Sequence, residues 1–179
     1  MCSLCMTVCP NRANQMYTVE PMLVDLPTLC VDESELMVSG TMQFATEQRY
    51  QIVNIADFCN ECGNCTTFCP TSGAPYRDKP RVHLSQDGFD NATYDSFFIR
   101  KTPDRTEVKA RFDGTMHSLE MVGHDVRYRG QGVLVLFDQN LKMREATPLD
   151  DMRDGTEVDL SIAAQMLVIA RAASVVPSK

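Results

Sequence analysis

The sequence predicts an α+β protein in two parts, residues 1–80 and residues 81–179, on the basis of three observations. Seven of the eight cysteines fall in two clusters, residues 2–9 and residues 59–69, and residues 70–179 contain none. Short apolar and β-branched segments bounded by Pro, Asp and Gly recur on both sides of Pro80, which favours strands. Near the C-terminus one apolar segment has helical spacing instead. The proline-spaced stretch TSGAPYRDKP is typical of an irregular connection and marks the predicted boundary.

Composition limits the possible functions. With 179 residues, 44% of them apolar, the chain is large enough for a packed core. A formal net charge of −7 opposes binding to the phosphate backbone of nucleic acid. No apolar run approaches the ~20 residues that span a bilayer, and residues 1–10 lack the features of a secretory signal. We therefore expect a cytoplasmic protein without membrane insertion, in which clustered cysteines favour metal or redox chemistry over disulfides.

Strands are predicted for the first part between the two cysteine clusters. They cover residues 22–26, 35–44 and 49–55, and they form a β-rich insert with its own sheet.

The second part is expected to be β-rich with a C-terminal helix. Two strand-like segments flank Asp113-Gly114, a pair that readily adopts the positive φ angles of a hairpin turn. A second hairpin is expected within residues 132–145. Asp159 is a candidate N-cap for a helix over residues 160–173, where apolar residues recur at helical spacing.

The segment CNECGNCTTFCP places Cys59, Cys62, Cys65 and Cys69 at gaps of two, two and three residues, with Pro70 directly behind. This is the C-x2-C-x2-C-x3-C-P run of two-cluster bacterial ferredoxins, in which three cysteines bind one 4Fe-4S cluster and the fourth binds the other. Zinc is the alternative, because tetrahedral zinc sites also use Cys-x2-Cys pairs. Zinc sites commonly join two pairs across a longer spacer, so the run favours iron–sulfur clusters.

The beginning of the chain, MCSLCMTVCP, repeats the end of this run. Cys2, Cys5, Cys9 and Pro10 correspond to its second, third and fourth cysteines and its proline, and the first cysteine would lie two positions before Met1. The strand expected to lead into the motif is missing as well. We therefore expect residues 1–80 to be a two-cluster ferredoxin-like domain truncated at its N-terminus.

The spacing assigns the cysteines to two clusters. Cluster II takes Cys59, Cys62, Cys65 and Cys9, while cluster I takes Cys2, Cys5 and Cys69, which leaves one iron of cluster I without a cysteine and labile. Cys30 is an alternative fourth ligand, but a free cysteine in the context LPTLCVD is more often a buried apolar residue.

One glycine, three histidines and a Gly-Gln-Gly segment are further candidates for a role at a functional site. Gly63 lacks a side chain that would block close approach to a cluster, although a glycine here is equally consistent with a turn. His83, His117 and His124 have no cysteine or carboxylate at ligand spacing and are expected to be ordinary surface or core histidines. Residues 130–132, Gly-Gln-Gly, are expected to form a turn rather than a dinucleotide-binding loop.

The segments CSLCMTVCPNRAN, CNECGNCTTFCP and GAPYRDKPRVHL, together with FDN, resemble the C-terminal iron–sulfur region of the selenate reductase iron–sulfur subunit family. These large flavin oxidoreductases are relatives of the glutamate synthase small subunit. The resemblance extends from Cys2 to about Phe98. It implies a multidomain parent whose upstream part binds FAD and a nicotinamide nucleotide, and it carries the ligand roles over to the seven cysteines assigned above. The missing first cysteine departs from the family pattern.

The expected function is therefore an electron-transfer module of a larger flavin- and nicotinamide-dependent oxidoreductase, with no substrate-converting residue assigned. Two 4Fe-4S clusters would pass electrons from a flavin-containing domain or subunit to a redox partner protein. The alternative is a zinc-stapled structural or protein-interaction module, in which residues 81–179 bind a protein partner. A free-standing ferredoxin is disfavoured by the missing cysteine and by the long C-terminal part.

Overall fold

The computed structural model describes residues 2–33, 35–149 and 152–176. In these residues nine strands form one sheet in the order β1-β4-β5-β6-β7-β8-β9-β10-β11, and three strands form a second sheet in the order β12-β2-β3. The strands of the large sheet are β1 (Asn14–Thr18), β4 (Tyr50–Ile55), β5 (Arg81–His83), β6 (Ser96–Lys101), β7 (Arg105–Phe112), β8 (Thr115–Val122), β9 (Asp125–Gly130), β10 (Val133–Asp138) and β11 (Met143–Pro148). The strands of the small sheet are β2 (Met22–Asp32), β3 (Glu35–Thr46) and β12 (Glu157–Val158).

Helices occur at both ends of the described chain and between the strands. They are α1 (Leu4–Thr7), α2 (Asn64–Thr67), α3 (Pro75–Asp78), α4 (Gln86–Asn91) and α5 (Ser161–Ala170), with two 3-10 turns, η1 (Ala56–Phe58) and η2 (Arg171–Ser174). In the described part of the chain, no helix has the length and apolar character needed to cross a bilayer.

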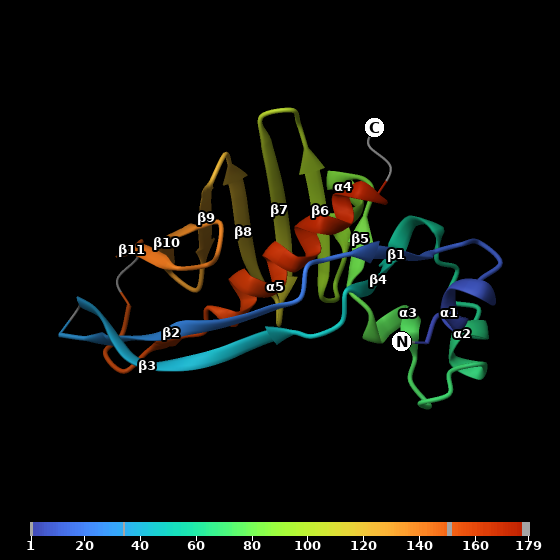
Figure 1. Ribbon diagram of the computed structural model, residues 1–179, viewed down its shortest axis with the longest axis horizontal. Coiled ribbons are helices and arrows are strands. Elements are labelled where there is room, and N and C mark those ends of the chain that lie inside the picture. Colours follow the sequence, from blue (N-terminus) through green and yellow to red (C-terminus); the bar gives the residue numbers. More distant parts are fainter. Residues whose placement is uncertain (1, 34, 150–151, 177–179) are drawn as a thin grey trace.

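Helix α5 confirms the predicted C-terminal helix and lies across the large sheet (Figure 1). Its sequence SIAAQMLVIA is apolar nearly all round, which is typical of a helix buried on more than one side. Ala163, Ala164 and Met166 are fully buried in the main hydrophobic core. Asp159 lies at the start of the helix, where its carboxylate accepts hydrogen bonds from the backbone N–H and the hydroxyl of Ser161 at 2.8 and 2.9 Å.

Both predicted hairpins are confirmed. Strands β7 and β8 pair antiparallel, and the intervening Asp113 and Gly114 have φ angles of 46° and 77°. Strands β10 and β11 form the second hairpin, within which Val133 pairs with Pro148. In the first of these hairpins, Asp113 and Gly114 therefore have the left-handed backbone that their identities favour.

The insert between the cysteine clusters differs from the prediction in one strand. Residues 22–26 and 35–44 lie within β2 and β3, which pair with each other as a long hairpin. Residues 50–55, by contrast, form β4, which pairs with β1 and β5 in the large sheet. The reason is burial: Val53 and Ile55 are fully buried in the main core, so this strand is drawn into the centre of the molecule.

The large sheet continues across the predicted boundary at Pro80. Strands β4 and β5 pair in parallel, with Asn54 opposite Arg81, and the N–H of Asn54 donates to the carbonyl of Pro80 at 2.8 Å. One hydrophobic core contains Val53 from before the boundary and Val82 from after it. Residues 1–80 and 81–179 thus share a sheet and a core. The division into two domains and the ferredoxin-like character of the first part stay predictions.

Candidate functional site

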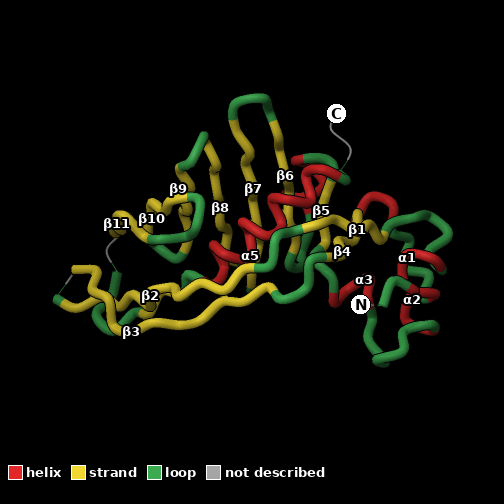
Figure 2. Tube along the Cα trace, in the orientation of Figure 1, coloured by secondary structure: helices red, strands yellow, loops and turns green. Residues whose placement is uncertain are grey.

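The cysteine motifs lie at one end of the molecule, beside the large sheet. Helices α1, α2 and α3 gather there, while the hairpin of β2 and β3 reaches toward the opposite end (Figure 1). Each of these three helices has four residues, and apart from the 3-10 turn η1 the remainder of this end is loop (Figure 2). We call this region, residues 2–13 and 56–79, the cysteine end.

The two cysteine motifs fold alike. Cys2, Cys5 and Cys9 correspond to Cys62, Cys65 and Cys69, each 60 positions later (2 to 62, 5 to 65, 9 to 69). Helices α1 and α2 occupy matching positions in the two motifs. In each helix the same two pairs of backbone groups are hydrogen-bonded: residue 7 donates to residue 3 and residue 8 to residue 4, and residue 67 donates to residue 63 and residue 68 to residue 64. The repeat seen in the sequence is therefore a repeat in the structure.

The last cysteine of each motif accepts a hydrogen bond from the backbone four residues later. The N–H of Ala13 donates to Cys9 Sγ at 3.2 Å, and the N–H of Gly73 donates to Cys69 Sγ at 3.3 Å. The residue before each donor has a positive φ, 54° in the first motif and 56° in the second, which turns the N–H back toward sulfur. Hydrogen bonds to the charged form of a thiol favour the thiolate, the form that binds metal.

Cys69 shows this effect most clearly. Its pKa is lowered first by the hydroxyl of Thr71, which lies 3.3 Å from Sγ, and then by the backbone N–H groups of Thr71 and Gly73. A Cβ on Gly73 would lie 2.9 Å from a carboxylate oxygen of Asp78 and 3.5 Å from Cys69 Sγ. The tight contact is with Asp78, so a side chain at residue 73 would require that carboxylate to move, whereas the distance to the sulfur is an ordinary contact.

Cys5 and Cys65 are the buried members of the two motifs. Each is 8% exposed, and with Ile52 they form a small apolar cluster separate from the main core. Burial raises the pKa of Cys5; Lys79 opposes that rise, and the neighbouring Cys65 and Cys2 add to it. Because Cys5 and Cys65 belong to one apolar cluster, the two motifs meet at their helices.

A buried amide pair attaches the first motif to the large sheet. Asn14 in β1 donates from Nδ2 to the carbonyl of Cys5 at 2.9 Å, and Asn54 in β4 donates from Nδ2 to Asn14 Oδ1 at 3.0 Å. Both asparagines are at most 2% exposed. Because buried polar groups are costly without partners, this chain of hydrogen bonds holds α1 in place against the sheet.

The remaining cysteines differ in exposure and place. Cys2 and Cys62 are exposed, and Cys9, Cys59 and Cys69 are half-buried. Cys30 lies in β2, paired with Met37 and Glu157 in the small sheet, and the structure does not bring it to the cysteine end. Within the described ranges, no three or more His, Cys, Asp and Glu side chains are gathered as they would be around a single metal ion.

The donor set fits iron–sulfur clusters. Six of the seven candidate cysteines lie in two repeated loops, and backbone N–H groups point at the last sulfur of each loop. Gly63 has a φ of 80° and open space where a Cβ would lie, so its turn conformation, rather than a close approach, is what requires glycine there.

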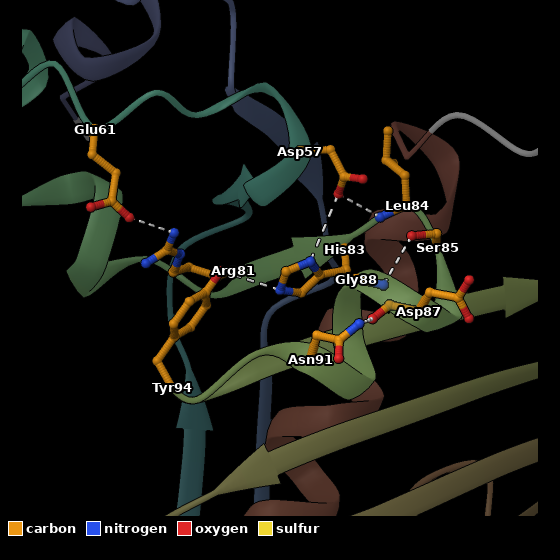
Figure 3. A network of polar contacts seen from close by, with 10 residues as sticks. All are labelled: Asp57, Glu61, Arg81, His83, Leu84, Ser85, Asp87, Gly88, Asn91 and Tyr94. Carbon is orange, nitrogen blue, oxygen red and sulfur yellow. Dashed lines mark hydrogen bonds and ion pairs between the residues drawn. The ribbon is translucent and has the colours of Figure 1, made fainter.

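A polar network lies beside the second motif, and no spacing of its residues in the sequence indicates it (Figure 3). Asp57 accepts a hydrogen bond from the backbone N–H of Leu84 at 2.9 Å and lies 3.9 Å from His83 Nδ1. Burial lowers the pKa of His83 and Asp57 opposes this, while Nε2 lies 3.3 Å from the hydroxyl of Tyr94. These residues come from η1, β5 and the loop after α4, so only the fold brings them together.

The other histidines and the Gly-Gln-Gly segment lie in strands and turns of the large sheet. His117 is buried, with Nδ1 2.8 Å from the hydroxyl of Tyr128, and His124 is exposed, with Nδ1 2.8 Å from Gln139 Oε1. Residues 130–132 form the turn between β9 and β10, as expected. A cavity of about 700 Å³ lies between the start of β2 and the end of α5, and no cysteine lines it.

Two known proteins are similar to part of this chain. The protein named "Putative oxidoreductase YgfK" from Escherichia coli strain K12 is 33% identical over 99 residues, which cover 55% of this chain and 7% of that protein. The protein of the same name from Escherichia coli O157:H7 gives the same values. The chain thus spans about 7% of the length of these curated relatives. No protein-family model matches the chain, and no solved structure does.

Proposed function

We propose that this chain is an electron-transfer module of a larger oxidoreductase and that it holds two iron–sulfur clusters. The observation that carries the proposal is the pair of cysteine loops that fold alike and meet at Cys5 and Cys65. Cluster I would be held by Cys2, Cys5 and Cys69, and cluster II by Cys59, Cys62, Cys65 and Cys9.

When bound, such a cluster accepts and releases single electrons at a potential that depends on hydrogen bonds to sulfur and on solvent exposure. The residues of this chain supply both influences. Ala13 and Gly73 donate backbone hydrogen bonds to Cys9 and Cys69, the two cysteines that each motif would lend to the other cluster. Hydrogen bonds to these sulfurs offset thiolate charge at the two positions where the motifs exchange ligands.

The similarity to an oxidoreductase supports a place in a larger redox protein. On this proposal a flavin-containing domain or subunit donates electrons, a redox partner protein accepts them, and the FAD and nicotinamide sites lie in the rest of the parent protein. The chain itself transfers electrons and converts no substrate.

Anaerobic purification of the full chain tests the proposal. We expect a brown protein with about equal iron and acid-labile sulfide, at most about eight of each, the sum for two 4Fe-4S clusters. Electron spin resonance of the reduced protein should show iron–sulfur signals. A colourless protein that contains zinc and no sulfide would overturn the proposal in favour of a zinc-stapled module.

Cysteine variants test the ligand assignment. Cys62→Ala should lower the iron content by at least about half, because it removes a ligand of cluster II and cluster I already lacks one cysteine. Cys30→Ala is the matched control, since Cys30 lies in the small sheet, and its iron content should equal that of the wild type. Full iron content in Cys62→Ala, or loss of iron in Cys30→Ala, would refute the assignment.

A further inference from the structure

We propose that Arg81 is a positioning residue for the second cysteine motif and that its charge raises the reduction potential of the group bound there. The positioning role concerns the chain alone. The effect on the potential rests on the proposed function, so the two are tested separately.

The guanidinium of Arg81 joins a strand of the large sheet to the cysteine loop (Figure 3). Arg81 begins β5 and is 9% exposed. Its Nη2 donates to Glu61 Oε1 at 2.8 Å, and Cζ lies 3.8 Å from the centre of the Tyr94 ring. Glu61 stands between Cys59 and Cys62, so the ion pair attaches the loop that carries these two cysteines.

Because Arg81 is buried, its positive charge depends on this contact. A guanidinium removed from water requires a charged or hydrogen-bonded partner, and here the ring of Tyr94 covers one face while Glu61 supplies the carboxylate. The fork of Arg81 is also planar and rigid, so it fixes the place of its partner better than a lysine would. The buried Nε has no hydrogen-bond partner among the residues that the structure describes, so the pair with Glu61 does not satisfy this donor of the guanidinium.

The backbone at Glu61 shows that the loop is held. Its φ is 55°, in the left-handed region that residues other than glycine rarely adopt. Such a conformation persists where the surroundings fix it. A second contact fastens the same loop to the same strand region, because Asp57 accepts from the backbone N–H of Leu84 at 2.9 Å. The loop is therefore tied down on both sides of Cys59.

The two charges of the pair differ in their surroundings. The side chain of Arg81 is 10% exposed and that of Glu61 is 51% exposed. Water screens an exposed charge far more than a buried one, so the field of Arg81 outweighs that of Glu61 at the motif. A positive field stabilises the reduced, more negative state of a redox group and so raises its potential.

Hydrogen exchange of the full chain as purified anaerobically, with its metal content unchanged, tests the positioning role. Two hydrogen-bonded amides report on the loop: Cys59, which donates to Ala56, and Thr66, which donates to Gly63. In Glu61→Gln and Arg81→Lys these amides should exchange about tenfold faster than in the wild type, since a lost charged hydrogen bond shifts the local opening by that order. Amides of β8 should be unchanged, which shows that the variants are folded.

Arg77→Gln is the matched control for charge. Arg77 lies in α3 at the same end and is exposed, with Cζ 5.2 Å from the centre of the Tyr76 ring. Its removal should leave exchange at Cys59 and Thr66 at the wild-type rate. Wild-type exchange in both Glu61→Gln and Arg81→Lys would overturn the positioning role.

Redox titration of the reconstituted protein tests the effect of charge. Arg81→Gln and Glu61→Gln break the same ion pair but remove opposite charges, so the potential should fall in the first and rise in the second, while Arg81→Lys keeps the wild-type potential. A shift in the same direction in both glutamine variants would mean that loosening alone acts, and would overturn the charge effect. Absence of iron and sulfide from the wild type would instead refute the proposed function, and hydrogen exchange would still decide the positioning role.

Discussion

The cysteine end and the sheet-rich body of this protein are held together in different ways. In the body, strands from both halves of the chain bury large side chains such as Ile55, Leu119 and Phe137 around helix α5. At the cysteine end three helices of four residues each surround one small cluster, formed by Cys5, Ile52 and Cys65. Helices this short are not stable by themselves in water. The body is therefore stabilised by apolar burial, whereas the cysteine end has few apolar contacts, and on the proposed function bound clusters would stabilise it.

Removal of metal should produce the largest difference in amide protection between the two regions. Treatment with a chelator and a reductant under anaerobic conditions should abolish the protection of amides in α1 and α2, because ligand binding and local folding are coupled. Amides of β7 and β8 should keep their protection, since no candidate ligand lies there. Hydrogen exchange measured by mass spectrometry distinguishes the regions, and loss of protection in β7 and β8 as well would show that they unfold together.

A cavity in the core should destabilise the body and leave the cysteine end unaffected. Leu119 is fully buried in β8, so Leu119→Ala should lower the free energy of unfolding by about 3 kcal/mol. The iron content should remain that of the wild type. Leu23→Ala is the control, because Leu23 is 65% exposed and its loss should change stability by less than about 0.5 kcal/mol. Urea unfolding measures both, and equal effects would contradict the assignment of the core.

Overpacking should give a smaller loss. A Cβ at Gly130 would meet His117 Nδ1 and the hydroxyl of Tyr128, so Gly130→Ala should lower the free energy of unfolding by about 1–3 kcal/mol. Gly40 in β3 has nothing within 4 Å of such a Cβ, and Gly40→Ala serves as the matched control. A Gly130→Ala variant as stable as Gly40→Ala would mean that the buried pair can move aside.

Acidification should lower the free energy of unfolding of the body by a small amount. Burial holds the pKa of His117 below its ordinary value of 6.5, so below that pH the unfolded chain binds a proton that the native chain does not. Stability is therefore complete above pH 6.5 and falls as the pH drops toward the folded pKa, by at most about 1.4 kcal/mol per pH unit for one proton. His83 has a pKa lowered by burial as well and adds to the slope.

The variant His117→Gln isolates the contribution of this histidine. Its free energy of unfolding should depend less steeply on pH between 6.5 and 5 than that of the wild type, because one titrating group is gone. His124→Gln is the control, since that side chain is exposed. An unchanged slope in His117→Gln would show that other groups cause the acid sensitivity.

Local structure, such as a turn, a helix and a cysteine loop, could be predicted from the sequence alone. Asp113-Gly114 predicted the turn of β7 and β8, since these residues tolerate positive φ wherever they occur. The apolar spacing after Asp159 predicted α5, and the spacing of the cysteines predicted two matching loops. In each case the information lies within a few neighbouring residues.

Tertiary structure alone decided how distant segments meet. It drew β4 out of the insert into the large sheet and continued that sheet past Pro80, because burial of Val53 and Ile55 requires partners on both sides. It also placed Arg81 between Glu61 and Tyr94, residues 20 positions before it and 13 after it in the chain (81 − 61 and 94 − 81). A guanidinium finds its partner by proximity in the folded state, and no pattern of neighbouring residues encodes that proximity.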